Sequence, residues 1–145
     1  MQNFAVYINP AFSDKKSIYN LLEKLRNHSA VNFFSIDSIP DLPKELFKPL
    51  PKTAKRKHID CILVFGGDGT ILKAKDLALL TGAPILGINL GYLGFLSESV
   101  LPEIASSIQN LKQGKYRLLQ RMLIECRLKR EGKIIYEAMA LNDAV

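Results

Sequence analysis

The residues most able to do chemistry form one short run, Gly66-Gly67-Asp68-Gly69-Thr70, in which a carboxylate stands among three glycines. Apolar residues 62–65 before the run predict a buried strand, and residues 71–80 after it predict a helix. Glycines allow positive φ and let a ligand approach the main chain closely. Free N–H groups and a partial positive charge at a helix start suit phosphate. The sequence therefore predicts a phosphate-binding loop made of Gly66, Gly67, Gly69 and Thr70.

Asp68 is the candidate catalytic residue in this loop. Beside bound phosphates its carboxylate could hold a metal ion or take a proton from an attacking hydroxyl. The simpler interpretation is a tight turn with a solvated aspartate, but such a turn needs one glycine and not three. Lys73 follows by five residues, about 140° around the helix axis. It could lean back toward the site or be an ordinary solvated lysine, and both interpretations stay open.

Composition limits the classes of partner. The chain has 145 residues, a net charge of +6 and 48% apolar residues, which suits one folded unit with a real core. A positive excess suits phosphorylated ligands and also nucleic acid. Trp is absent and aromatic residues make up 8%, so a stacking platform for single strands is missing. We expect small-molecule substrates and no nucleic acid.

The cysteines and the apolar runs bear on location. Cys61 and Cys126 lie far apart without metal-ligand spacing, which is typical of reduced core thiols. The first ten residues lack the basic region of a signal peptide. No run reaches the ~18 apolar residues that a membrane span needs. These observations predict a soluble, cytoplasmic protein with no membrane partner.

Strands alternate with helices through most of the chain. The pattern predicts strands at 4–8, 31–36, 61–65 and 85–88. It predicts a helix with Asp14 as N-cap that runs to about His28, a helix at 71–80 stopped by Thr81-Gly82, and a helix from about 100 to Gly114. Residues 37–57 contain four prolines and a basic tract. We expect there a long irregular connection, either a solvated mobile loop or a basic arm for a polyanionic ligand. The order predicts an α/β fold, a Rossmann-like parallel sheet with flanking helices.

A second glycine-rich segment, residues 89–96, follows the strand predicted at 85–88. Ligands of open α/β sheets bind outside the C-terminal ends of the strands. Both glycine segments follow such ends, so we expect them to face one crevice.

The pattern changes after Gly114. Residues 121–129 alternate between apolar and charged, and residues 134–138 form a returning strand after a turn. We interpret this hairpin as the start of an antiparallel β-rich domain. The predicted domains are 1–114, an α/β nucleotide-binding domain, and 115–145, the first strands of a truncated β-rich domain. The sequence stops in mid-pattern, which suggests a truncated chain.

Three common kinds of site do not fit. No Gly-x-x-x-x-Gly-Lys segment of a P-loop is present. A dinucleotide fingerprint starting at Gly67 would need a third glycine where Leu72 stands. His28 and His58 fall at a helix end and in the basic tract, where catalytic triads are not expected.

Three segments together resemble the NAD kinase family. They are the turn 66–72, residues 84–96, and Ala140-Leu141-Asn142-Asp143. The resemblance spans about residues 60–145. It implies transfer of the ATP γ-phosphoryl group to the 2′-hydroxyl of the adenosine ribose of NAD, giving NADP. It also implies Mg²⁺ or another divalent metal as cofactor and a homo-oligomer, a dimer or tetramer, for a full-length protein.

The resemblance also implies roles for single residues. Asp68 is the catalytic residue, and Asp68, Gly69, Lys73, Asn142 and Asp143 bind NAD. The family often has Glu where this chain has Asp143. Family members continue through a β-rich domain that completes the NAD pocket, so the 145 residues alone are expected to be inactive. Whether ATP or polyphosphate is the donor stays open.

Two alternatives remain. A lipid kinase of the diacylglycerol or sphingoid type would share the glycine-aspartate turn. The fragment could also be a folded but inactive piece of a NAD kinase. The residues 71–74 after the turn and the second glycine segment argue against a lipid kinase.

Overall fold

A computed structural model describes residues 1–35, 43–50, 58–91 and 94–141. The helices are α1 (Lys15–Ser29), α2 (Asp68–Thr81) and α3 (Ile104–Lys112), with 3₁₀ turns η1 (Lys44–Leu46) and η2 (Leu101–Glu103). The strands are β1 (Asn3–Ile8), β2 (Asn32–Ser35), β3 (Phe47–Pro49), β4 (Cys61–Phe65), β5 (Ile85–Asn89), β6 (Ser99–Val100), β7 (Ile124–Arg130) and β8 (Lys133–Ala140).

Six of these strands form one parallel sheet in the order β3-β2-β1-β4-β5-β6. The order reverses between β1 and β4, and the chain leaves both strands at the same edge of the sheet. In doubly wound sheets, ligands bind in the crevice outside this point of reversal. The predicted Rossmann-like α/β fold is therefore confirmed.

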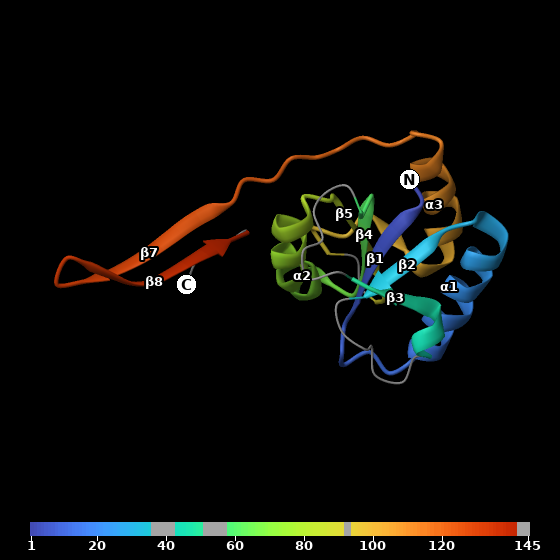
Figure 1. Ribbon diagram of the computed structural model, residues 1–145, viewed down its shortest axis with the longest axis horizontal. Helices are drawn as coiled ribbons and strands as arrows, with labels where there is room; N and C mark the ends of the chain where they lie inside the picture. Colours follow the sequence, from blue (N-terminus) through green and yellow to red (C-terminus); the bar gives the residue numbers. More distant parts are fainter. Residues whose placement is uncertain (36–42, 51–57, 92–93, 142–145) are drawn as a thin grey trace.

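Helices cover both faces of the sheet, as Figure 1 shows. Side chains alternate along β4, so Leu63 and Phe65 enter the core under α1 and α3. Ile62 and Val64 enter the core under α2. All five residues of β4 are buried, as expected for a central parallel strand with helices on both sides.

Local signals set the ends of α1 and α2. The Asp14 side chain accepts a hydrogen bond from the Ser17 N–H at 3.2 Å and caps α1, as predicted. Gly82 ends α2 in the left-handed conformation, with φ 67°. Its N–H donates to the Ala78 carbonyl at 2.7 Å, a common C-terminal cap for glycine.

The structure corrects two parts of the predicted element order. β3 and η1 lie inside the stretch 37–57 predicted as an irregular connection, whereas residues 37–42 and 51–57 of that stretch lie outside the described part. Pro49 is tolerated because β3 is an edge strand with one paired side. Ser99, predicted to lead directly into a helix, instead pairs with Ile88 in β6. Runs of two or three residues are too short to show a period.

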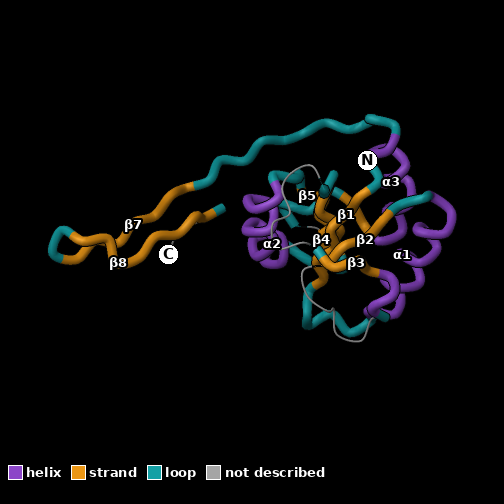
Figure 2. The backbone as a smooth tube through the Cα atoms, viewed as in Figure 1, coloured by secondary structure: helices purple, strands orange, loops and turns teal. Residues whose placement is uncertain are grey.

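The strands β7 and β8 form a separate antiparallel hairpin, as predicted. Figures 1 and 2 show it standing away from the sheet, joined to α3 by a long extended loop. Large apolar side chains are exposed on it, with Leu128 at 57% and Tyr136 at 63%. Arg127 forms an ion pair with Glu137 on the opposite strand at 2.9 Å. It forms a second ion pair with Glu125 on its own strand at 2.7 Å.

Candidate functional site

The glycine-aspartate turn lies where β4 passes into α2. The Gly66 N–H donates to the Ile88 carbonyl at 2.9 Å, which ties the turn to β5. A Cβ added to Gly66 would lie 2.3 Å from Thr70 Oγ1. Thr70 is itself buried in the first turn of α2. The turn therefore packs tightly on the start of the helix, and Gly66 is required for that packing.

The other two glycines of the turn do not use the positive φ that glycine allows. Gly67 has φ −86°, and Gly69 is not among the residues with positive φ. A Cβ at either position would meet no atom within 4 Å. Because they have no side chains, these two glycines leave open space in front of the backbone, which a ligand could enter.

The start of α2 is open to an anion. No side chain caps it, and the Gly67 carbonyl accepts from the Thr70 and Ile71 N–H groups at 2.9 and 3.2 Å. The amides of the first residues and the helix dipole give this end a positive potential. An acidic side chain, Asp68, stands in this first turn.

Asp68 turns away from its own helix toward the second glycine segment. Its Oδ2 accepts a hydrogen bond from the Phe95 N–H at 2.9 Å, and its Oδ1 accepts one from the Leu96 N–H at 3.0 Å. A Cβ added to Gly94 would lie 2.3 Å from Asp68 Oδ1. The two segments predicted to face one crevice are thus in direct contact through Asp68.

The half-buried Asp68 carboxylate accepts two hydrogen bonds and keeps further acceptor sites free. An ionised carboxylate offers about four lone-pair sites, and two are occupied here. It can therefore be held in place and still accept a proton or coordinate a cation.

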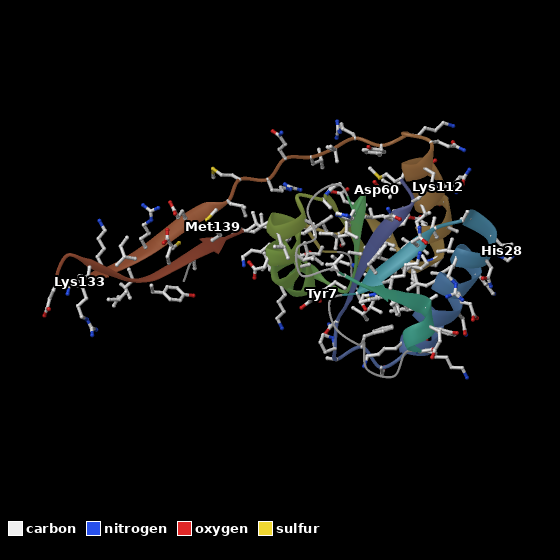
Figure 3. The ribbon with its side chains drawn as sticks, viewed as in Figure 1. Tyr7, His28, Asp60, Lys112, Lys133 and Met139 are labelled. Carbon is white, nitrogen blue, oxygen red and sulfur yellow. The ribbon has the colours of Figure 1, made fainter. Side chains whose placement is uncertain are left out.

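A groove of about 510 Å³ runs beside this turn, between α2 and the end of β8. Gly69, Leu72 and Lys73 line it from the helix, and Met139 and Leu141 line it from the hairpin. Figure 3 labels Met139 at the end of the hairpin nearer α2. Asn142 and Asp143 lie outside the described residues, but they follow Leu141 directly in the chain.

The lysines of the groove differ in their engagement. Lys75 donates to Asp76 at 2.9 Å, so its charge is matched within the helix. Lys73 is exposed and has no ion-pair partner among the described residues. Its charge is available to an anion in the groove that it lines.

Other candidate groups are not assembled into a site. Within the described ranges no three His, Cys, Asp or Glu side chains are grouped as a metal centre. His58 is exposed, and His28 contacts the Lys24 carbonyl on the surface. Burial raises the pKa of the Cys61 thiol to about 12. No helix in the described ranges is long and apolar enough to cross a bilayer.

Sequence reasoning missed the part that Gly94 and the backbone of Phe95 and Leu96 play around Asp68. These residues stand 26 to 28 positions after Asp68, so no local pattern links them. The available signal was the second glycine-rich segment, which predicted a shared crevice but not the contact.

Comparison with known proteins decides the family. The family described as "ATP-NAD kinase N-terminal domain" matches residues 17–116. The chain belongs to this NAD kinase family. The match includes the turn 66–70, the groove-lining part of α2 and the second glycine segment, and it ends just after α3.

Curated relatives agree with this assignment. The chain is 33% identical to the NAD kinase of Clostridium beijerinckii, covering 100% of this chain and 48% of that protein. It is 43% identical to the NAD kinase of Desulforamulus reducens, covering 59% of this chain and 30% of that protein. The chain spans between about a third and a half of the length of the curated relatives it matches.

A solved structure shares the fold. The yeast NADH kinase complexed with NADH superposes with a TM-score of 0.67 over 97% of this chain and 43% of that chain. The sequence identity is 21%, so this likeness shows the fold alone.

Proposed function

We propose that the protein to which these residues belong is a NAD kinase. It transfers the γ-phosphoryl group of ATP to the 2′-hydroxyl of the adenosine ribose of NAD. The observation that carries the proposal is the position of Asp68. Its carboxylate lies beside an uncapped helix start, at the edge of the sheet where ligands of this fold class bind. The names of the curated NAD kinase relatives support the same substrate.

The proposed roles follow the open surfaces of the site. The loop of Gly66, Gly67, Gly69 and Thr70 binds phosphate, since its second and third glycines face free space. Gly69 and Lys73 bind NAD from α2, in the groove that Leu141 also lines. Asn142 and Asp143, next along the chain, are proposed to complete that contact.

Asp68 is proposed as the catalytic residue. A carboxylate is a weak base toward an alcohol. It therefore orients the ribose hydroxyl and accepts its proton late, when the hydroxyl becomes acidic through bonding to phosphorus. Phosphoryl transfer is catalysed mainly by positioning and charge neutralisation, which suits a fixed carboxylate.

A divalent ion such as Mg²⁺ fits this site in one way. Mg²⁺ is commonly bound by one or two carboxylates together with substrate phosphates and waters. The free acceptor sites of Asp68 could supply one such ligand. When bound, the ion would neutralise charge on the ATP phosphates.

We further propose residues 1–114 as the nucleotide-binding domain and 115–145 as the first strands of a β-rich domain. The exposed apolar side chains of β7 and β8 support this, because a finished sheet would cover them. On this proposal the 145 residues bind NAD weakly and the complete gene product binds it well, as a homo-oligomer. Calorimetry with NAD on both proteins tests it; equal affinities would contradict it.

The activity is tested by incubating the complete gene product with ATP, Mg²⁺ and either NAD or diacylglycerol. We expect NADP to form and no phosphatidic acid. The reverse result would favour the lipid kinase alternative. Repeating the NAD assay with polyphosphate in place of ATP, and measuring NADP, would identify the phosphoryl donor.

A further inference from the structure

The contact between Asp68 and residues 94–96 is unusual for an aspartate at a helix start. In the first turn of a helix, a carboxylate is normally stabilised by the partial positive charge of the helix N-terminus. Asp68 instead accepts from N–H groups 27 and 28 residues further along. The N-cap of α2 is Gly67, which has no side chain to cap the helix. The carboxylate is held by the second glycine segment.

The backbone of this segment, not its side chains, makes the contact. The Phe95 side chain is 94% exposed, so burial of the ring does not hold the segment in place. The hydrogen bonds reach both carboxylate oxygens, which fixes the orientation of the carboxylate plane as well as its position. The Gly94 N–H donates to Ser97 Oγ at 3.3 Å and anchors the segment on its other side.

Gly94 makes this approach possible. A Cβ on this residue would lie 2.3 Å from Asp68 Oδ1 and 2.7 Å from Asp68 Cγ, well inside van der Waals contact. Any other residue would push the segment and the carboxylate apart. Gly91 in the same segment has nothing within 4 Å of an added Cβ and is not in the left-handed region.

We propose that Gly94 is a positioning residue that lets the Phe95 and Leu96 amides hold the Asp68 carboxylate in its working orientation. Its role in the reaction rests on the proposed kinase function; the hydrogen-bonded clamp itself does not. Because the carboxylate is oriented before substrate arrives, Gly94 should affect turnover more than substrate binding. A misplacement of about 1 Å costs on the order of 10²-fold in rate.

Kinetics of the complete gene product test the positioning role, with Gly94→Ala compared with the wild type. We expect Gly94→Ala to lower kcat for NADP formation about 10²-fold with little change in KM for ATP. The double variant Gly94→Ala/Asp68→Asn should lose no more than Asp68→Asn alone, because Gly94 acts through Asp68. Normal kcat in a folded Gly94→Ala protein, or additive losses, would overturn the proposal.

Amide hydrogen exchange on the 145-residue chain tests the clamp without any activity. We expect the Phe95 and Leu96 amides to be protected in the wild type and to exchange at least about tenfold faster in Asp68→Ala. The Ile62 amide of β4, which donates to the Pro84 carbonyl at 2.8 Å, serves as internal reference. Equal exchange in both proteins would overturn the clamp, even if Gly94→Ala did not fold. If the exchange data confirm the clamp but the protein makes no NADP, the proposed kinase function is refuted and the clamp is not.

Discussion

Gly66 and Thr70 are packed so closely that a Cβ on the glycine would lie 2.3 Å from the threonine Oγ1. Thr70 is 7% exposed and belongs to the first turn of α2, so it cannot move aside without disturbing the helix start. The strand β4, the turn and the helix are therefore joined as one rigid corner. That corner carries Asp68.

The first prediction compares two glycines of this corner. Gly66→Ala should lower the free energy of unfolding by about 1–3 kcal/mol, the usual cost of overpacking. Gly69→Ala faces open space inside a helix, so it should leave stability unchanged or raise it by up to about 1 kcal/mol. Chemical denaturation of the 145-residue chain measures both.

The same pair separates packing from ligand approach. Gly69→Ala is expected to weaken NAD binding by the complete gene product although its stability is intact, because its methyl group enters the proposed ligand space. Two results would contradict this account: a Gly66→Ala protein as stable as the wild type, or normal NAD affinity in Gly69→Ala.

The second prediction concerns pH. Hydrogen bonds from the Ser17 hydroxyl and then the Ser17 N–H lower the pKa of the Asp14 carboxyl below its usual value. A lowered folded-state pKa stabilises the fold above the unfolded pKa of about 3.9, and the gain is lost as pH falls through the folded value. Asp14→Ala should thus lower the thermal midpoint at pH 7 and make progressively less difference below about pH 4.

Asp14→Asn is the matched control, because asparagine caps a helix about as well as aspartate and does not titrate. It should be nearly as stable as the wild type at neutral pH. A stability gap between Asp14→Ala and the wild type that stays constant into the acid range would show that the charge of Asp14 has no part in the cap.

The third prediction concerns the two thiols. Cys61 is buried in β4 with its pKa raised to about 12 by burial, whereas Cys126 lies half-buried on the hairpin. Because the thiolate is the reactive form, a disulfide reagent at pH 8 should modify Cys126 and leave Cys61 untouched. Cys126→Ser should remove the fast reaction, and denaturant should expose the second thiol. Rapid modification of Cys61 in the native protein would mean that β4 opens readily.

Patterns that lie close together in the sequence predicted most of the fold. Short segments of a few residues carry three of these signals: the buried run of β4, the Asp14 cap and the Gly82 stop. Each predicted boundary is within a few residues of the observed one. The alternation of strands and helices predicted the parallel sheet. The strands β3 and β6 were missed because their identity comes from pairing with β2 and β5, not from their own residues.

The sequence predicted individual residues of the site but not the contacts between them. The glycine-aspartate turn pointed to Asp68 because its residue types are unusual together. The reason for Gly94 lies in a carboxylate 26 residues away, and only the folded chain brings the two within contact. The proposed roles of Asn142 and Asp143 come from the resemblance and stay predictions.

The central claim is tested most directly by replacing Asp68 with asparagine in the complete gene product and measuring NADP formation from NAD and ATP. Asparagine keeps the size of the side chain and removes the charge and the proton-accepting capacity. The account predicts that turnover falls by at least ~10²-fold while the protein stays folded and still binds NAD. Turnover close to that of the wild type would contradict it.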